Sequence, residues 1–211
     1  MSMHISHETI YSYIYVLPRG RLKCRLVSYL RRAHKHRRKG NKGRKKSGPV
    51  TDFLSIEERP AEIADRTIPG HWEGDLVIGS RNASAMGTLI ERTTRMAFLV
   101  KLDNQDARVV RKAFAEEFRH LPKGLKRTLT YDQGQEMAQH KLFTKETDIT
   151  VYFAHPHSPW ERGSNENTNA LLRQYFPKGT DFTKVSKERL KMVQDELNDR
   201  PRITLGFCTP H

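Results

Sequence analysis

The sequence predicts an α/β protein in which a mixed sheet of five strands carries helices on both faces. After residue 69, short apolar runs typical of strands are separated by segments whose apolar residues recur at helical spacing. Their order is three strands, helix, strand, helix, strand and two helices, which fits a mixed sheet that begins with an antiparallel meander. Charge adds a third observation: residues 1–50 hold 14 Lys and Arg against one acid, a net +13, whereas residues 51–211 hold a net +1. A basic arm therefore precedes a nearly neutral body, and such arms usually bind nucleic acid.

The arm begins with two expected helices. Ser6 can cap a helix over residues 5–16, and a second helix is expected over residues 20–33. The first helix has an apolar stripe at helical spacing, formed by Ile10, Tyr13, Ile14 and Leu17. Two interpretations stay open: a small packing helix, or the last part of a helix-turn-helix.

Residues 31–46 carry ten Lys and Arg and offer nothing apolar to bury, so we expect this segment to be disordered in isolation. A solvated linker is the simplest interpretation, but ten cations favour contact with DNA phosphates, without sequence specificity. The expected phosphate-binding side chains are Arg31, Arg32, Lys35, Arg37, Arg38, Lys39, Lys42, Arg44, Lys45 and Lys46.

Three regions are expected: a helical remnant of a DNA-binding region over 1–33, a basic linker punctuated by prolines over 34–68, and a globular core over 69–211. Cys24 and Cys208 form no CxxC pair, which argues against a zinc finger and favours a reducing compartment. No apolar run approaches 18 residues and no signal peptide is recognisable, so we expect a cytoplasmic protein without a membrane span.

The body is expected to start with a strand over residues 71–79, in which Asp75 stands among apolar residues. Two further strands are joined by a tight turn at Thr94 and Arg95, and the remaining strands and helices follow in alternation. The expected strands are 71–79, 85–93, 96–102, 127–132 and 150–154, and the expected helices are 106–119, 136–147, 165–176 and 186–198.

Three acidic residues are predicted to form one site. Asp75 is costly inside an apolar strand unless it is paired, and Asp132 ends the fourth strand. Glu166 lies in the first turn of a helix that Ser164 can cap after a turn at Gly163, where the helix dipole favours a charged carboxylate. Such a glutamate is most often structural, but three acids brought together repel unless a divalent cation binds them. Oxygen ligands suit Mg²⁺ or Mn²⁺, and two such ions can promote phosphodiester cleavage.

The sequence resembles the DDE transposases of the bacterial insertion-sequence-thirty family, within the retroviral integrase superfamily. The resemblance rests on six segments: ISHETIYSYIY (5–15), GHWEGDLVIG (70–79), GTLIERTTR (87–95), LTYDQGQE (129–136), YFAHPHSPWERGSNENTNALLRQYFPKGTD (152–181) and LNDRPRITLGFCTP (197–210). It implies a ribonuclease-H-like core in which Asp75, Asp132 and Glu166 hold two Mg²⁺ or Mn²⁺ ions. Thirty-three residues separate Asp132 from Glu166, the spacing expected for this family.

The implied reaction is cleavage of DNA at the ends of an insertion sequence, followed by transfer of the freed 3′-hydroxyl into target DNA. The implied partners are double-stranded DNA and further copies of the chain, in association with the bacterial nucleoid. Expected DNA contacts in the body are Arg173, seven residues after Glu166, together with Asn165, Asn169 and His157, of which the two asparagines could instead orient Glu166.

Other side chains carry weaker expectations. Glu73 and Glu136 are expected to be solvated, with a role close to the metal ligands as the alternative. Metal ligation by His155 has little support, and Trp160 is expected to pack at the turn rather than stack on a base.

The resemblance also implies a copy truncated at its N-terminus, because relatives begin with a complete helix-turn-helix region. A second hypothesis is therefore a non-catalytic DNA-binding remnant, or an inhibitor of full-length transposase. Its binding to DNA would survive mutation of the three acids and would be lost when residues 31–46 are deleted.

Overall fold

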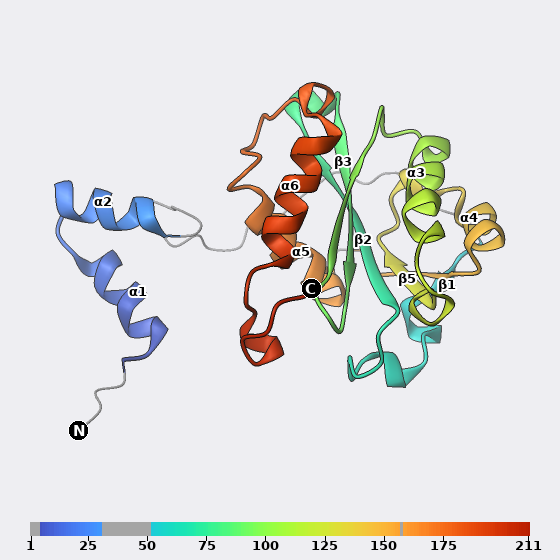
Figure 1. Ribbon diagram of the computed structural model, residues 1–211, viewed down its shortest axis with the longest axis horizontal. Coiled ribbons are helices and arrows are strands. Elements are labelled where there is room, and N and C mark those ends of the chain that lie inside the picture. Colours follow the sequence, from blue (N-terminus) through green and yellow to red (C-terminus); the bar gives the residue numbers. More distant parts are fainter. Residues whose placement is uncertain (1–4, 31–51, 157) are drawn as a thin grey trace. The chain divides into compact units, whose positions relative to one another are not determined.

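The computed structural model describes residues 5–30, 52–156 and 158–211 (Figure 1). The chain divides into two units, Met1–Lys45 and Lys46–His211, and each is considered by itself. The basic residues expected to bind phosphate, Arg31 to Lys46, and the candidate DNA contact His157 lie outside the described residues.

The first unit contains α1 (His7–Val16) and α2 (Arg21–Tyr29). Ser6 caps α1 as predicted, since its hydroxyl accepts a hydrogen bond from the Thr9 N–H. Lys23 links the two helices by donating to the carbonyls of Tyr15 and Leu17, both at 2.7 Å. The second helix is shorter than predicted and ends at Tyr29.

Only part of the predicted stripe of α1 is buried. Ile14 is buried, whereas Ile10 and Tyr13 are exposed. The periodicity of α1 therefore identified the helix correctly but not the extent of its burial.

The second unit is built on a sheet of six strands in the order β1-β6-β5-β2-β3-β4. The strands are β1 (Leu54–Ser55), β2 (His71–Ile78), β3 (Ala85–Glu91), β4 (Ala97–Lys101), β5 (Thr128–Tyr131) and β6 (Thr150–Phe153). The antiparallel meander β2-β3-β4 is confirmed, and β5, β6 and β1 extend the sheet in parallel. The prediction of five strands was wrong, because β1 comes from the segment expected to be linker and pairs with β6 over only two residues.

Helices cover both faces of the sheet, as predicted (Figure 1). Helices α3 (Ala107–Arg119) and α4 (His140–Thr147) pack on one face through Phe114, Phe118 and Phe143. Helices α5 (Gly163–Leu172) and α6 (Lys187–Asn198) pack on the other through a second apolar cluster that includes Leu172 and Val193. Alternate residues of a strand point to opposite faces, so Trp72 and Leu76 belong to the α3/α4 face, and Glu73, Asp75 and Val77 to the α5/α6 face.

Short 3₁₀ helices fill several connections. They are η1 (Ile56–Glu58), η2 (Ala61–Ile63), η3 (Ser80–Asn82), η4 (Lys123–Leu125), η5 (Gln135–Met137), η6 (Pro159–Arg162), η7 (Phe182–Lys184) and η8 (Ile203–Leu205). The helix predicted over residues 136–147 is thus split into η5 and α4, and the one predicted over residues 165–176 begins at Gly163 and ends at Leu172.

The predicted start of α5 was wrong in its details. Arg162 occupies the N-cap position without a capping side-chain hydrogen bond, and Ser164 lies buried inside the first turn, where its hydroxyl accepts from Arg95. Gly163 has ordinary helical backbone angles, with φ −60°, so it makes no tight turn.

Among the described residues, no helix has the length and apolar character needed to cross a membrane. Cys24 and Cys208 are both exposed free thiols.

Candidate active site

Asp75 and Asp132 come together on neighbouring parallel strands. The register of β2 and β5 pairs His71 with Thr128 and Glu73 with Thr130. Continuing this offset by two residues sets Asp75 beside Asp132, just beyond the end of β5. The predicted convergence of these two acids at the carboxyl end of a parallel strand is therefore the arrangement that the sheet produces.

A guanidinium group connects the two carboxylates. Arg162 places Nη2 at 3.1 Å from Oδ2 of Asp132 and Nη1 at 3.5 Å from Oδ1 of Asp75. Its Nη1 also donates to the carbonyl of Gly74 at 3.1 Å. The sequence analysis did not single out Arg162, although its place four residues before Glu166 was visible.

Asp75 is held from two further sides. Its Oδ1 accepts a hydrogen bond from the Leu76 N–H at 2.9 Å, and its Oδ2 accepts from Nδ2 of Asn169 at 2.9 Å. Burial raises the pKa of Asp75, the charge of Arg162 opposes this rise, and the charge of Asp132 adds to it. Asn169 thus orients Asp75, whereas it was expected to contact DNA or to orient Glu166.

Glu166 stands apart from this pair. It is exposed in the first turn of α5. Within the described part of the chain, no group of three His, Cys, Asp or Glu side chains is close enough to hold a metal ion. The structure therefore brings together two of the three predicted ligands and leaves the third at the edge of the same face.

The residues present fit a hard divalent cation. Asp75 and Asp132 supply carboxylate oxygens, which Mg²⁺ and Mn²⁺ prefer. Next to them, Oδ1 of Asn169 is buried without a hydrogen-bond partner, a polar oxygen for which the protein provides no donor. Asp75 and Asp132 would hold the ion, and Glu166 is the third ligand expected from the sequence.

Glu73 belongs to a buried polar network instead of being solvated as predicted. It is fully buried, and its Oε1 lies 3.0 Å from Nε of Arg92, while its Oε2 accepts from the backbone N–H of Asn165 at 2.9 Å. Asn165 also donates to the Glu73 carbonyl and accepts from the hydroxyl of Thr88. These contacts tie the first turn of α5, and hence the backbone of Glu166, to the central strand β2.

Asn165 therefore cannot be the DNA contact that was expected, because it is buried and its amide is engaged within the protein. Arg173 is partly buried, and its Nη2 donates to the carbonyl of Ile78 at 2.9 Å. Burial lowers the pKa of Arg173, and its Nη1 is buried without a partner.

Glu136 and Trp160 also differ from expectation. Glu136 lies in η5 and is partly buried; burial raises its pKa, and the charges of Asp132 and Asp75 contribute to the rise. Its position close to the two aspartates thus supports the alternative of a role close to the metal ligands. Trp160 is 74% exposed, so the prediction that it packs at the turn was wrong.

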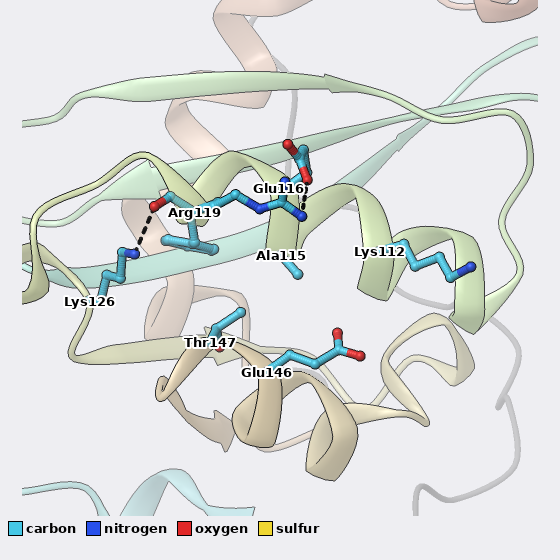
Figure 2. A pocket seen from close by; sticks show the side chains of 8 residues that line it. Lys112, Ala115, Glu116, Arg119, Lys126, Glu146 and Thr147 are labelled. Carbon is cyan, nitrogen blue, oxygen red and sulfur yellow. Dashed lines mark hydrogen bonds and ion pairs between the residues drawn. The ribbon is translucent and has the colours of Figure 1, made fainter.

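A cleft of about 550 Å³ lies on the opposite face of the sheet, between α3 and α4 (Figure 2). Several of its charged side chains are already engaged: Arg119 binds Glu116, Lys126 donates to the Arg119 carbonyl, and Glu146 binds Arg111. This cleft therefore takes no part in the candidate active site.

His155, in the segment before η6, forms ion pairs whose strength depends on pH. Its Nδ1 lies 2.8 Å from Oε1 of Glu161 and its Nε2 lies 3.3 Å from Oε1 of Glu57. The hydrogen bond to Glu161 raises the pKa of His155, and the charges of Glu161 and Glu57 act in the same direction. A raised folded-state pKa means that the stabilisation is complete below the unfolded value of about 6.5 and is lost as the pH rises through the folded value.

We therefore expect His155→Gln to lower the melting temperature more at pH 6 than at pH 9. Thermal unfolding of wild type and variant at both pH values measures the difference. Glu161→Gln should show the same pH dependence, since it removes the main partner. An equal loss at both pH values would contradict this account of His155.

The sequence and the fold were compared with those of known proteins. The family described as "Integrase core domain" matches residues 66–159, a stretch that includes Asp75 and Asp132 and ends before Glu166. A chain of a simian T-cell lymphotropic virus intasome, solved with the PP2A regulatory subunit B56 gamma, superposes with a TM-score of 0.55 at 17% identity. The match covers 68% of this chain and 53% of that one. The fold is therefore that of an integrase core, a ribonuclease-H-like mixed sheet covered on both faces.

Curated relatives are more similar in sequence. The transposase for insertion sequence element IS1086 of Cupriavidus metallidurans is 48% identical over 208 residues, which are 99% of this chain and 61% of that protein. Transposase InsI for IS30A of Escherichia coli is 42% identical over 99% of this chain and 55% of its own length. The transposase for IS4351 of Bacteroides fragilis is 38% identical over 98% and 63%, respectively.

This chain is similar to insertion-sequence transposases, including those of the IS30 elements, and its residues 66–159 match the integrase core family. It spans about three fifths of the length of the curated relatives that it matches.

Proposed function

We propose that this chain catalyses metal-dependent cleavage of DNA at the ends of an insertion sequence and transfer of the freed 3′-hydroxyl into target DNA. The observation that carries the proposal is the pairing of Asp75 and Asp132 on adjacent parallel strands, beneath the helix whose first turn holds Glu166. The identity of 38–48% to named transposases supports the same reaction class.

In this proposal Asp75, Asp132 and Glu166 hold two Mg²⁺ or Mn²⁺ ions. The ions would activate water or a sugar hydroxyl and stabilise the leaving oxygen of the phosphodiester. The chain itself orients the ligands: Asn169 fixes one oxygen of Asp75, and the Gly134 N–H donates to Oδ1 of Asp132 at 3.1 Å. The buried contact between Glu73 and Asn165 sets where α5 begins, and so where Glu166 is presented.

The partners that we propose follow from DNA being the substrate. Double-stranded DNA would be the ligand, both as element ends and as target, and the bacterial nucleoid would be the place of action. The ten cations of residues 31–46 supply charge for phosphate contacts without reading the sequence. Joining two element ends at one target favours more than one copy of the chain on the DNA. Arg173 stays a candidate for a contact with the DNA backbone, although its Nη1 is buried and its Nη2 donates to the Ile78 carbonyl, so its side chain would have to move to reach DNA.

A cleavage assay on a DNA fragment that carries the element ends tests the proposal. We expect nicking and strand transfer in Mg²⁺ or Mn²⁺, and neither in EDTA. Nicking that persists in EDTA would overturn the metal-dependent mechanism. DNA binding without any cleavage, lost on deleting residues 31–46, would instead support a non-catalytic DNA-binding protein.

A further inference from the structure

We propose that Arg162 is a built-in counter-cation of Asp75 and Asp132, which holds their carboxylates together and must leave them before a divalent ion can bind. This inference rests on the proposed function, because it concerns the same metal site. It makes Arg162 a positioning residue, one that acts through the two aspartates and sets how tightly the site binds a metal ion.

The contacts of Arg162 place its charge between the two acids. Nη2 lies 3.1 Å from Asp132, Nη1 lies 3.5 Å from Asp75, and Nη1 also donates to the Gly74 carbonyl. The Arg162 side chain is only 11% exposed, so water screens these charges far less than at the surface. One cation thus opposes the repulsion between two carboxylates that adjacent strands force together.

A divalent ion would compete for the same oxygens. Asp75 already accepts hydrogen bonds from Leu76 and Asn169, and Asp132 already accepts one from Gly134. The guanidinium occupies the side on which the two carboxylates face each other. An arginine keeps its proton in proteins, so it can neither bind a metal ion nor lose its charge, and it can make way only by moving.

Arg162 lies at a junction between two helices. Arg162 ends η6 and directly precedes α5, whose first turn carries Glu166, so its displacement would alter the start of that helix. Gly163 lies between η6 and the rest of α5. A Cβ added to Gly163 would meet nothing within 4 Å, and the φ angle of Gly163 is −60°. The present conformation therefore does not require glycine, whereas a second conformation could use the freedom that glycine alone provides.

Mn²⁺ binding measured by calorimetry tests the inference with three variants. Arg162→Gln should bind Mn²⁺ about tenfold more tightly than wild type, because the competing charge is gone. Arg162→Lys should stay near wild type, because it keeps the charge. Arg111→Gln is the matched control, since Arg111 has a similarly buried side chain, 10% exposed, and pairs with Glu146 on the other face of the sheet.

Equal or weaker Mn²⁺ binding by Arg162→Gln, relative to wild type and Arg111→Gln, would overturn the inference while leaving the proposed metal site in place. If neither wild type nor Arg162→Gln binds Mn²⁺ at millimolar concentration, both the metal site and this inference fail.

Trp160 provides a second test in the wild-type chain, which does not depend on whether Arg162→Gln folds. The two tryptophans of the protein are Trp160, 74% exposed and two residues before Arg162, and Trp72, buried in the core. Release of Arg162 should change the Trp160 emission during an Mn²⁺ titration, and Trp160→Phe should remove this change. Mn²⁺ binding without any change in emission would contradict the displacement of Arg162.

Discussion

Glu73→Ala is expected to lower the free energy of unfolding by about 3–5 kcal/mol, the usual cost of removing one partner from a buried ion pair. Glu73 is fully buried and Arg92 is 5% exposed, so the substitution leaves a desolvated guanidinium without its carboxylate. Burial already lowers the pKa of Arg92, and the charge of Glu73 is what opposes that effect. The Asn165 N–H loses its acceptor as well, so the first turn of α5 keeps only the side-chain contacts of Asn165 as its tie to the sheet.

Urea denaturation measures this loss, and Asp195→Ala is a suitable control. Asp195 pairs with Lys191 on the exposed surface of α6, where the same change should cost less than about 1 kcal/mol. Replacing Glu73 and Arg92 together by methionine should cost less than the sum of the two single substitutions, because neither charge is then left alone. A Glu73→Ala loss as small as that of the control would show that the network does not stabilise the fold.

Asp132→Asn is expected to reduce metal-dependent DNA cleavage at least about a thousandfold, or about 4 kcal/mol in the barrier. The substitution keeps the shape of the side chain, but its single oxygen can accept from the Gly134 N–H or from Arg162 and not from both. What it removes is the charge that would hold a divalent cation. Single-turnover cleavage of a labelled element end measures the rate.

Asp148→Asn is the control for the loss of one carboxylate, because Asp148 is exposed at the end of α4, a helix that packs on the opposite face of the sheet from Asp75. We expect it to cleave as wild type does, and both variants to melt within a few degrees of wild type. An Asp132→Asn chain that is folded and cleaves at the control rate would remove Asp132 from the site.

The order of elements and the meeting of Asp75 with Asp132 could be predicted from the sequence for physical reasons. Strands β2 and β5 are short apolar runs with clear boundaries. Asp75 lies inside β2 and Asp132 directly follows β5. A carboxylate in either position costs free energy unless it serves a site. The reaction class came from the resemblance of the segments around Asp132 and Glu166 to transposases. Relatives that match 98–99% of the chain now support that resemblance.

The remaining features depend on tertiary contacts that leave no local pattern. Strand β1 has two residues and exists only because β6 offers a parallel edge. The contact of Glu73 with Asn165 joins residues 92 positions apart, and the bridge from Arg162 to Asp132 spans 30. Glu73 was therefore assigned to solvent and Asn165 to DNA or to the orientation of Glu166, and Arg162 was assigned no role, although all three make contacts inside the protein.

The central claim is that Glu166 completes a metal-dependent site with Asp75 and Asp132, and cleavage by Glu166→Gln tests it most directly. Glu196→Gln is the matched control, since both glutamates are exposed on a helix of the same unit. With Mg²⁺ and a DNA fragment carrying the element ends, we expect Glu166→Gln to bind DNA and melt as wild type does, yet to nick at least about a hundredfold more slowly. Nicking by Glu166→Gln at the rate of Glu196→Gln would contradict the assignment.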